Sequence, residues 1–139
     1  MKKIIRRYLV ITAVVTCLIG STAYAYDSPF ILGMTPRSAS TVNGNLCTLD
    51  ISCYSTLCGA SVWNKSGSNR FMSVGAWAYD EDGTLINVST NSGEKASGAG
   101  VSATIGTRNG DKTVGQGIIY NGTTSGSGVA ETLSGSVTR

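Results

Sequence analysis

Residues 70–91, RFMSVGAWAYDEDGTLINVSTN, form the clearest strand-turn-strand pattern of the chain. Side chains alternate between the two sides of an extended chain, so that Phe71, Ser73, Gly75, Trp77 and Tyr79 fall on one side. The acidic run 80–83 interrupts this period, and its aspartates and final glycine suit a short hairpin turn. Apolar residues occupy both faces of the first strand. We therefore expect that strand to lie centrally in a sheet and to be covered on both sides.

A period of two recurs in five further stretches, with short polar or glycine-containing segments between them. Together with the hairpin they give about seven short strands at the spacing typical of a sandwich or small barrel. The last stretch has the features of an edge strand, and Asn109-Gly110 predicts a hairpin turn between the third and fourth. The five stretches are 47–53, 58–63, 101–105, 113–120 and 129–137.

These patterns predict an all-β fold, a small antiparallel β-sandwich. It resembles an immunoglobulin-like arrangement only in architecture, because the Cys–Trp–Cys spacing of true immunoglobulin domains is absent. We expect three segments: a signal-peptide helix over residues 1–25, an extended leader over 26–44 and the sandwich domain over 45–139.

The N-terminus has the three parts of a secretory signal peptide. Four Lys and Arg residues lie among the first seven positions, an apolar run follows, and Ala23-Tyr24-Ala25 is a small-x-small cleavage site that leaves Tyr26 first in the mature chain. The apolar run is shorter than the roughly 20 residues of a spanning helix, so we expect no stable membrane span after cleavage. The compact, lysine-rich signal is typical of bacteria. We expect a secreted protein, periplasmic where the source has an outer membrane.

Removing this segment changes the charge balance. Four of the eleven basic residues lie within it and all eight acidic residues follow it, which leaves the mature chain a net charge of about −1. A nearly neutral chain without a basic cluster does not have the electrostatic pattern of a nucleic-acid-binding protein.

Three cysteines follow the signal, and export permits a disulfide. Cys47 and Cys53 cannot pair with each other within one extended strand, because about 20 Å would separate them. Loop geometry favours Cys53–Cys58, and Cys47–Cys58 is the alternative. The odd thiol is then a buried small side chain or an intermolecular link, and burial is the simpler expectation.

Catalytic and metal-binding chemistry has little support in the sequence. Without histidine, a Ser-His-Asp or Cys-His arrangement cannot be built, and a carboxylate pair such as Asp50 with Glu131 has no supporting pattern. The run 80–83 resembles part of a calcium loop, but the full pattern is missing and a hairpin turn explains it. We expect no enzyme, no cofactor and no metal.

Aromatic residues are the best candidates for a ligand surface. Core packing is the commoner role for strand aromatics such as Phe71, and it competes evenly with ligand contact at Trp63. A flat face suited to stacking on sugar rings could be formed by Trp63, Trp77, Tyr79 and Tyr120.

The sequence therefore predicts a secreted, non-catalytic binding or structural module for an extracellular ligand or an envelope component. The alternative is a bacteriocin-like antimicrobial or toxin effector, since small size, export and a disulfide suit that class equally well. Self-association through the edge strand 129–137 or through the odd cysteine is a further expectation.

Overall fold

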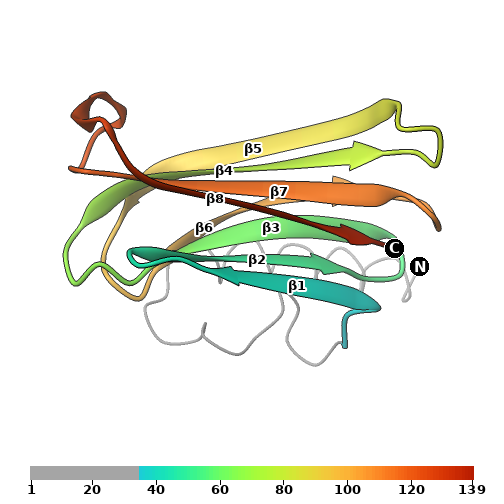
Figure 1. Ribbon diagram of the computed structural model, residues 1–139, viewed down its shortest axis with the longest axis horizontal. Coiled ribbons are helices and arrows are strands. Elements are labelled where there is room, and N and C mark those ends of the chain that lie inside the picture. Colours follow the sequence, from blue (N-terminus) through green and yellow to red (C-terminus); the bar gives the residue numbers. More distant parts are fainter. Residues whose placement is uncertain (1–34) are drawn as a thin grey trace, which may run out of the picture.

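The computed structural model describes residues 35–139, which form two packed antiparallel sheets (Figure 1). Sheet A has the strand order β1-β2-β3-β6 and sheet B the order β5-β4-β7-β8. The expected signal-peptide helix and its cleavage residues Ala23, Ala25 and Tyr26 lie outside the described residues. The strands are β1 (Ser38–Asn43), β2 (Cys47–Cys53), β3 (Leu57–Asn64), β4 (Arg70–Tyr79), β5 (Leu85–Lys95), β6 (Gly100–Gly106), β7 (Lys112–Tyr120) and β8 (Val129–Thr138).

The predicted all-β sandwich is confirmed, with eight strands in the described part of the chain where about seven were expected. The additional strand is β1, which lies in the segment expected to be a leader. It pairs antiparallel with β2 along its whole length, from Ser38 opposite Cys53 to Asn43 opposite Thr48. Its sequence SASTVN is short and mostly polar, so it shows no apolar alternation, and its pairing places the start of the sandwich before residue 45.

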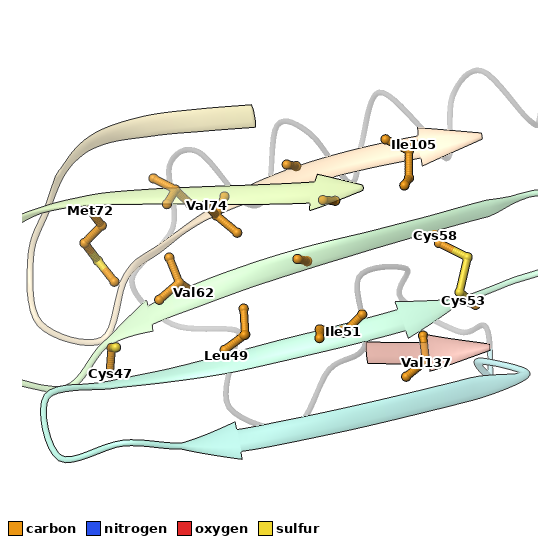
Figure 2. Packing of buried hydrophobic residues seen from close by; sticks show 14 of the residues in the cluster. Cys47, Leu49, Ile51, Cys53, Cys58, Val62, Met72, Val74, Ile105 and Val137 are labelled. Atoms are coloured by element: carbon orange, nitrogen blue, oxygen red, sulfur yellow. A yellow bond between two sulfur atoms is a disulfide. The ribbon is translucent and has the colours of Figure 1, made fainter. Parts of the chain in front are cut away.

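The core fills the space between the inner faces of the two sheets (Figure 2). Aliphatic side chains such as Leu49, Val62 and Met72 are fully buried there. The sheets approach closely at β7, because a Cβ on Gly117 would lie only 2.8 Å from the Cβ of Val62. Glycine at this position therefore permits the spacing of the layers.

Strand β4 is central in sheet B, as predicted, but it is covered on one face only. Its inner residues Met72 and Val74 are buried, whereas the aromatic residues on its outer face are partly exposed. The expectation of cover on both sides was wrong. Apolar residues on both faces of a strand do not distinguish a second core contact from a surface that carries aromatic rings.

The Asn109-Gly110 turn does not form a hairpin, because β6 belongs to sheet A and β7 to sheet B. Instead, the connection is fastened to the end of the chain. Gly110 takes a positive φ of 88° and its N–H donates to the Arg139 carbonyl, while the Arg139 N–H donates to the Asp111 carbonyl. The Asn-Gly dipeptide thus forms a turn in a connection between the two sheets. The sequence alone does not distinguish such a turn from a hairpin turn.

The likeness to immunoglobulin domains ends at the two-layer arrangement. Immunoglobulin sheets place the first, second, fifth and fourth strands together, whereas here the first three strands are neighbours in one sheet. Within residues 35–139 no helix is long and apolar enough to cross a membrane.

Two asparagines bridge the edge strands β5 and β6 on one side of the sandwich. The Oδ1 atoms of Asn87 and Asn91 accept the N–H groups of the following residues, Val88 and Ser92, each at 2.9 Å. Their amide groups donate across the gap to carbonyls of β6, Asn91 to Ser102 at 3.0 Å and Asn87 more weakly to Gly106 at 3.4 Å. Each side chain therefore satisfies a backbone donor on one sheet and a backbone acceptor on the other.

On the opposite side, Glu131 of β8 joins sheet B to the turn between β1 and β2. Its carboxylate accepts the backbone N–H groups of Asn45 at 2.7 Å, Leu46 at 2.9 Å and Cys47 at 3.0 Å. The Cys47 thiol donates to the same carboxylate at 3.4 Å. Burial alone would raise the pKa of Glu131, but these donors outweigh it and hold the pKa below its ordinary value.

Candidate ligand-binding face

The outer face of sheet B carries a row of side chains that face away from the core. In β4 this row consists of every second residue from Phe71 to Tyr79, and it includes Gly75 and Trp77. The pairing with β5 sets Val88 beside Trp77, Thr90 beside Gly75 and Ser92 beside Ser73. The pairing with β7 sets Val114, Gln116 and Ile118 on the other side of the same three residues.

Trp77 lies folded back along β4 over Gly75. A Cβ built on Gly75 would overlap ring atom Cη2 of Trp77, and would lie 2.7 Å from Cζ3 and 2.8 Å from Cζ2. The indole ring therefore occupies the space that a side chain at position 75 would fill. Because the ring covers backbone rather than standing free, the sheet holds it in place while leaving it partly exposed.

A groove of about 420 Å³ opens beside this ring on the outer face of sheet B. No charged side chain lines it; its walls combine the indole with hydroxyl, amide and aliphatic groups. The lining side chains on this face are Ser73, Trp77, Thr90, Ser92, Gln116 and Ile118.

Aromatic and apolar residues flank the groove at both ends of β4. At one end Phe71 meets Tyr120 edge to face, with ring centroids 5.5 Å apart and planes at 74°. At the other end Tyr79 lies next to Leu85, which is 50% exposed. Val88, next to Trp77, is 51% exposed. Apolar surface of this kind on an outer sheet face is typical of interaction sites.

Three of the four predicted ligand-surface residues share this face: Trp77, Tyr79 and Tyr120. Trp63 does not join them. It lies on the outer face of sheet A, across the sandwich from Trp77, and is 6% exposed. Its ring packs against Gly100, where a Cβ would lie 2.6 Å from Cε3.

The polar members of the groove were not singled out by the sequence. Gln116 and Thr90 come from strands far apart in the chain, and pairing with β4 brings both beside Gly75. The available signal was the alternation within β4, which places Ser73 and Gly75 on the same side as Trp77. Identifying the rest requires the strand order and the register.

The predicted disulfide Cys53–Cys58 is confirmed, with Cα atoms 4.1 Å apart (Figure 2). The two residues are cross-strand partners at the end of the β2–β3 hairpin. Cys47 is a free, buried thiol at the other end of β2. Burial, with the hydrogen bond to Glu131 and its negative charge, raises the pKa of the Cys47 thiol to about 12, so the thiol stays protonated.

The acidic residues do not form a paired site. Asp50 lies on the outer face of sheet A, where it accepts a hydrogen bond from Thr41, whereas Glu131 belongs to the inner face of sheet B. The acidic run 80–83 is a turn, in which the Asp80 carboxylate accepts the N–H groups of Asp82 and Thr84. Among the described residues, no three His, Cys, Asp or Glu side chains are grouped closely enough to hold a metal ion.

No protein-family model matches the sequence, and no curated protein is similar to it. Among solved structures, the chain is similar to a Bacteroides uniformis β-glucuronidase, with 11% identity and a TM-score of 0.39. It is also similar to Bacteroides uniformis β-glucuronidase 2 covalently bound to cyclophellitol-6-carboxylate aziridine, with 9% identity and a TM-score of 0.39. Both similarities cover 72% of this chain but only 12% of the glucuronidase chain. They do not identify a function.

Proposed function

We propose that the protein is a secreted, non-catalytic binding module that holds an extracellular or envelope ligand on the outer face of sheet B. The observation that carries this proposal is the groove of about 420 Å³ beside the partly exposed indole of Trp77. Concave surfaces lined by an aromatic ring and a few polar groups are typical of ligand sites.

The distribution of aromatic residues supports this choice. The core between the sheets is built from aliphatic residues, methionine and cysteine, while Phe71, Trp77 and Tyr79 lie on the outer face of sheet B. Fully burying a large apolar side chain contributes about 1.5–3 kcal/mol relative to leaving it exposed. Aromatic rings gathered on a partly exposed face forgo part of that stabilisation, which suits residues that contact a partner.

Two features support export. The disulfide Cys53–Cys58 requires an oxidising environment to form and persist. The pattern of residues 1–25 is that of a bacterial secretory signal. A mature chain beginning at Tyr26 would retain every described strand.

The proposal is tested by binding measurements with Trp77→Ala. We expect the purified protein to bind at least one of three soluble polymers: a neutral glycan, an anionic glycan or an unstructured peptide. The variant should bind at least tenfold more weakly, a loss of about 1.4 kcal/mol, because the ring forms the wall of the groove. Isothermal titration calorimetry gives the affinities, and circular dichroism confirms the fold.

Trp63→Phe is the matched control, because it changes an aromatic residue on the other face of the sandwich and should leave the affinity unchanged. Binding that survives Trp77→Ala, or no binding to any of the three polymers, would contradict the proposal.

A further inference from the structure

We infer that the ligand of this face is an uncharged oligosaccharide, one of whose pyranose rings stacks on Trp77. This inference rests on the proposed function and assigns its ligand class. Three properties of the groove lead to it: the way the indole is seated, the kind of polar groups around it, and the position of the charges.

The indole offers a flat apolar surface of the size of a sugar ring. Its six-membered ring packs against Gly75, where the sheet backbone supports it. The same residue lines the groove and is partly exposed. The electron-rich face of an aromatic ring attracts polarised C–H bonds, and a pyranose has such bonds on one of its faces.

The groups around the indole match hydroxyls rather than a peptide backbone. Gln116 and Thr90 lie on either side of Gly75, and Ser73 and Ser92 lie further along the same strands. Hydroxyl and carboxamide groups can each donate and accept hydrogen bonds, as sugar hydroxyls do. A peptide that added a strand to sheet B at β5 would need the N–H groups of that edge, but Asn87 and Asn91 already accept two of them.

The charges of this face lie at its ends. Lys112 is the cross-strand partner of Tyr79, and Glu94 is the partner of Phe71, while no charged side chain lines the groove between them. An anionic chain over Trp77 would lose water and gain no cationic partner, which is costly. A neutral chain meets no such penalty, so the uncharged groove is complementary to an uncharged ligand.

The length of the face indicates a chain rather than a single sugar. The Trp77 ring lies over Gly75, which is four residues from Phe71 on β4, or about 13 Å along the strand. Phe71 with Tyr120 forms a second aromatic contact point at that end. A ligand that reaches both points is longer than one pyranose ring.

The test is calorimetric titration of the whole protein with neutral hexasaccharides that differ in linkage and sugar. They comprise β-1,4-linked glucose, β-1,4-linked N-acetylglucosamine, β-1,4-linked mannose, β-1,3-linked glucose and α-1,4-linked glucose. Polygalacturonate and a polylysine peptide serve as charged probes, and the corresponding monosaccharides test chain length.

We expect at least one hexasaccharide to bind, with an affinity that differs less than twofold between 50 and 500 mM salt and is at least tenfold higher than that of its monosaccharide. Trp77→Ala should lower the affinity at least tenfold, and Gln116→Ala about three- to tenfold. Thr132→Ala should leave it unchanged, because Thr132 is an exposed residue of the same outer face that does not line the groove.

The other outcomes separate this inference from the proposed function. Binding of polygalacturonate or polylysine that depends on Trp77 and falls steeply with salt would overturn the assignment to a neutral glycan and leave the binding face standing. Failure of every hexasaccharide and both charged probes to bind would overturn both.

Discussion

The side chain of Glu131 accepts four hydrogen bonds from one turn and the strand that follows it. Its carboxylate accepts three consecutive backbone N–H groups of the β1–β2 turn and the Cys47 thiol, and so links sheet B to the first hairpin of sheet A. Hydrogen bonds to a charged acceptor contribute more to stability than bonds between neutral groups.

Replacing this acceptor should destabilise the protein. We expect Glu131→Ala to lower the free energy of unfolding by about 1–3 kcal/mol, because three backbone donors lose their charged acceptor. Glu131→Gln, which keeps one carbonyl oxygen but no charge, should cost less. Urea unfolding at pH 7 followed by tryptophan fluorescence measures both changes. A loss below the experimental error in Glu131→Ala would show that water replaces the carboxylate without cost.

The same contact should make stability depend on acid. The pKa of Glu131 is lower in the folded chain than the ordinary value of about 4.3 that applies after unfolding. Its contribution is therefore complete above that ordinary value, and is lost as the pH falls through the folded pKa. We expect the stability difference between wild type and Glu131→Gln to shrink from pH 7 to pH 2.5. A constant difference over that range would contradict the role of the charge.

At the scale of single elements, β5 is an edge strand that has to be protected from pairing with other chains. It forms one edge of sheet B, and three of its apolar residues, Leu85, Ile86 and Val88, are between 44% and 51% exposed. Long apolar edge strands are templates for pairing with other chains. The bonds of Asn87 and Asn91 to the β5 backbone and to β6 occupy two donors of this edge.

Removing both asparagine side chains should therefore expose the edge. We expect the double variant Asn87→Ala, Asn91→Ala to self-associate at concentrations at which the wild type does not, as measured by sedimentation velocity. It should also lose about 1–2 kcal/mol of stability, since several partly exposed hydrogen bonds disappear.

A second double variant, Asn87→Asp with Asn91→Asp, separates the two halves of each bridge. A carboxylate still accepts the N–H groups of Val88 and Ser92 but cannot donate to β6 while ionised. We expect it to lose stability without self-associating. Equal self-association of the wild type and the alanine variant would show that the asparagines do not protect this edge.

The strands that sequence predicted best are those whose side chains alternate between core and outer face. The predicted strand 47–53 coincides with β2, because four of its residues enter the core in strict alternation. The missed strand β1 and the longer second half of β5 are edge segments rich in Ser, Thr and Asn. Hydrogen bonds with other strands specify their pairing. A local apolar pattern does not reveal such bonds, so the sequence did not predict these segments as strands.

At the scale of the whole molecule, the two outer faces of the sandwich differ in a way that sequence could not assign. Trp63 and Trp77 both alternate with small residues in strands of similar composition, yet one is buried over Gly100 and the other lines the groove. Aromatic candidates were therefore identifiable from the sequence, whereas their division between two faces depends on the strand order.

The disulfide should make a modest contribution to the stability of the whole domain, because the stabilisation grows with loop length and this loop is short. Cys53 and Cys58 are separated by five positions, and closing so small a loop contributes about 2 kcal/mol. We expect a reductant to lower the free energy of unfolding by that amount in the wild type. Urea unfolding with and without the reductant measures it.

Two variants control this measurement. Cys47→Ala should respond to the reductant as the wild type does, because Cys47 is not part of the disulfide. The double variant Cys53→Ala, Cys58→Ala should not respond at all. A response that persists in the double variant would assign the effect to something other than this bond.

The position of this bond in the β2–β3 hairpin also has a consequence for oxidative folding. Cys53 and Cys58 become neighbours as soon as two adjacent strands pair, before either sheet is complete. Hairpins form within about 1–10 μs, far faster than disulfide chemistry. The same pairing sets Cys47 opposite Asn64, about 20 Å along β2 from the other two sulfurs. The three cysteines of the described residues thus select the correct pair by local register, and the third thiol is carried into the core still reduced.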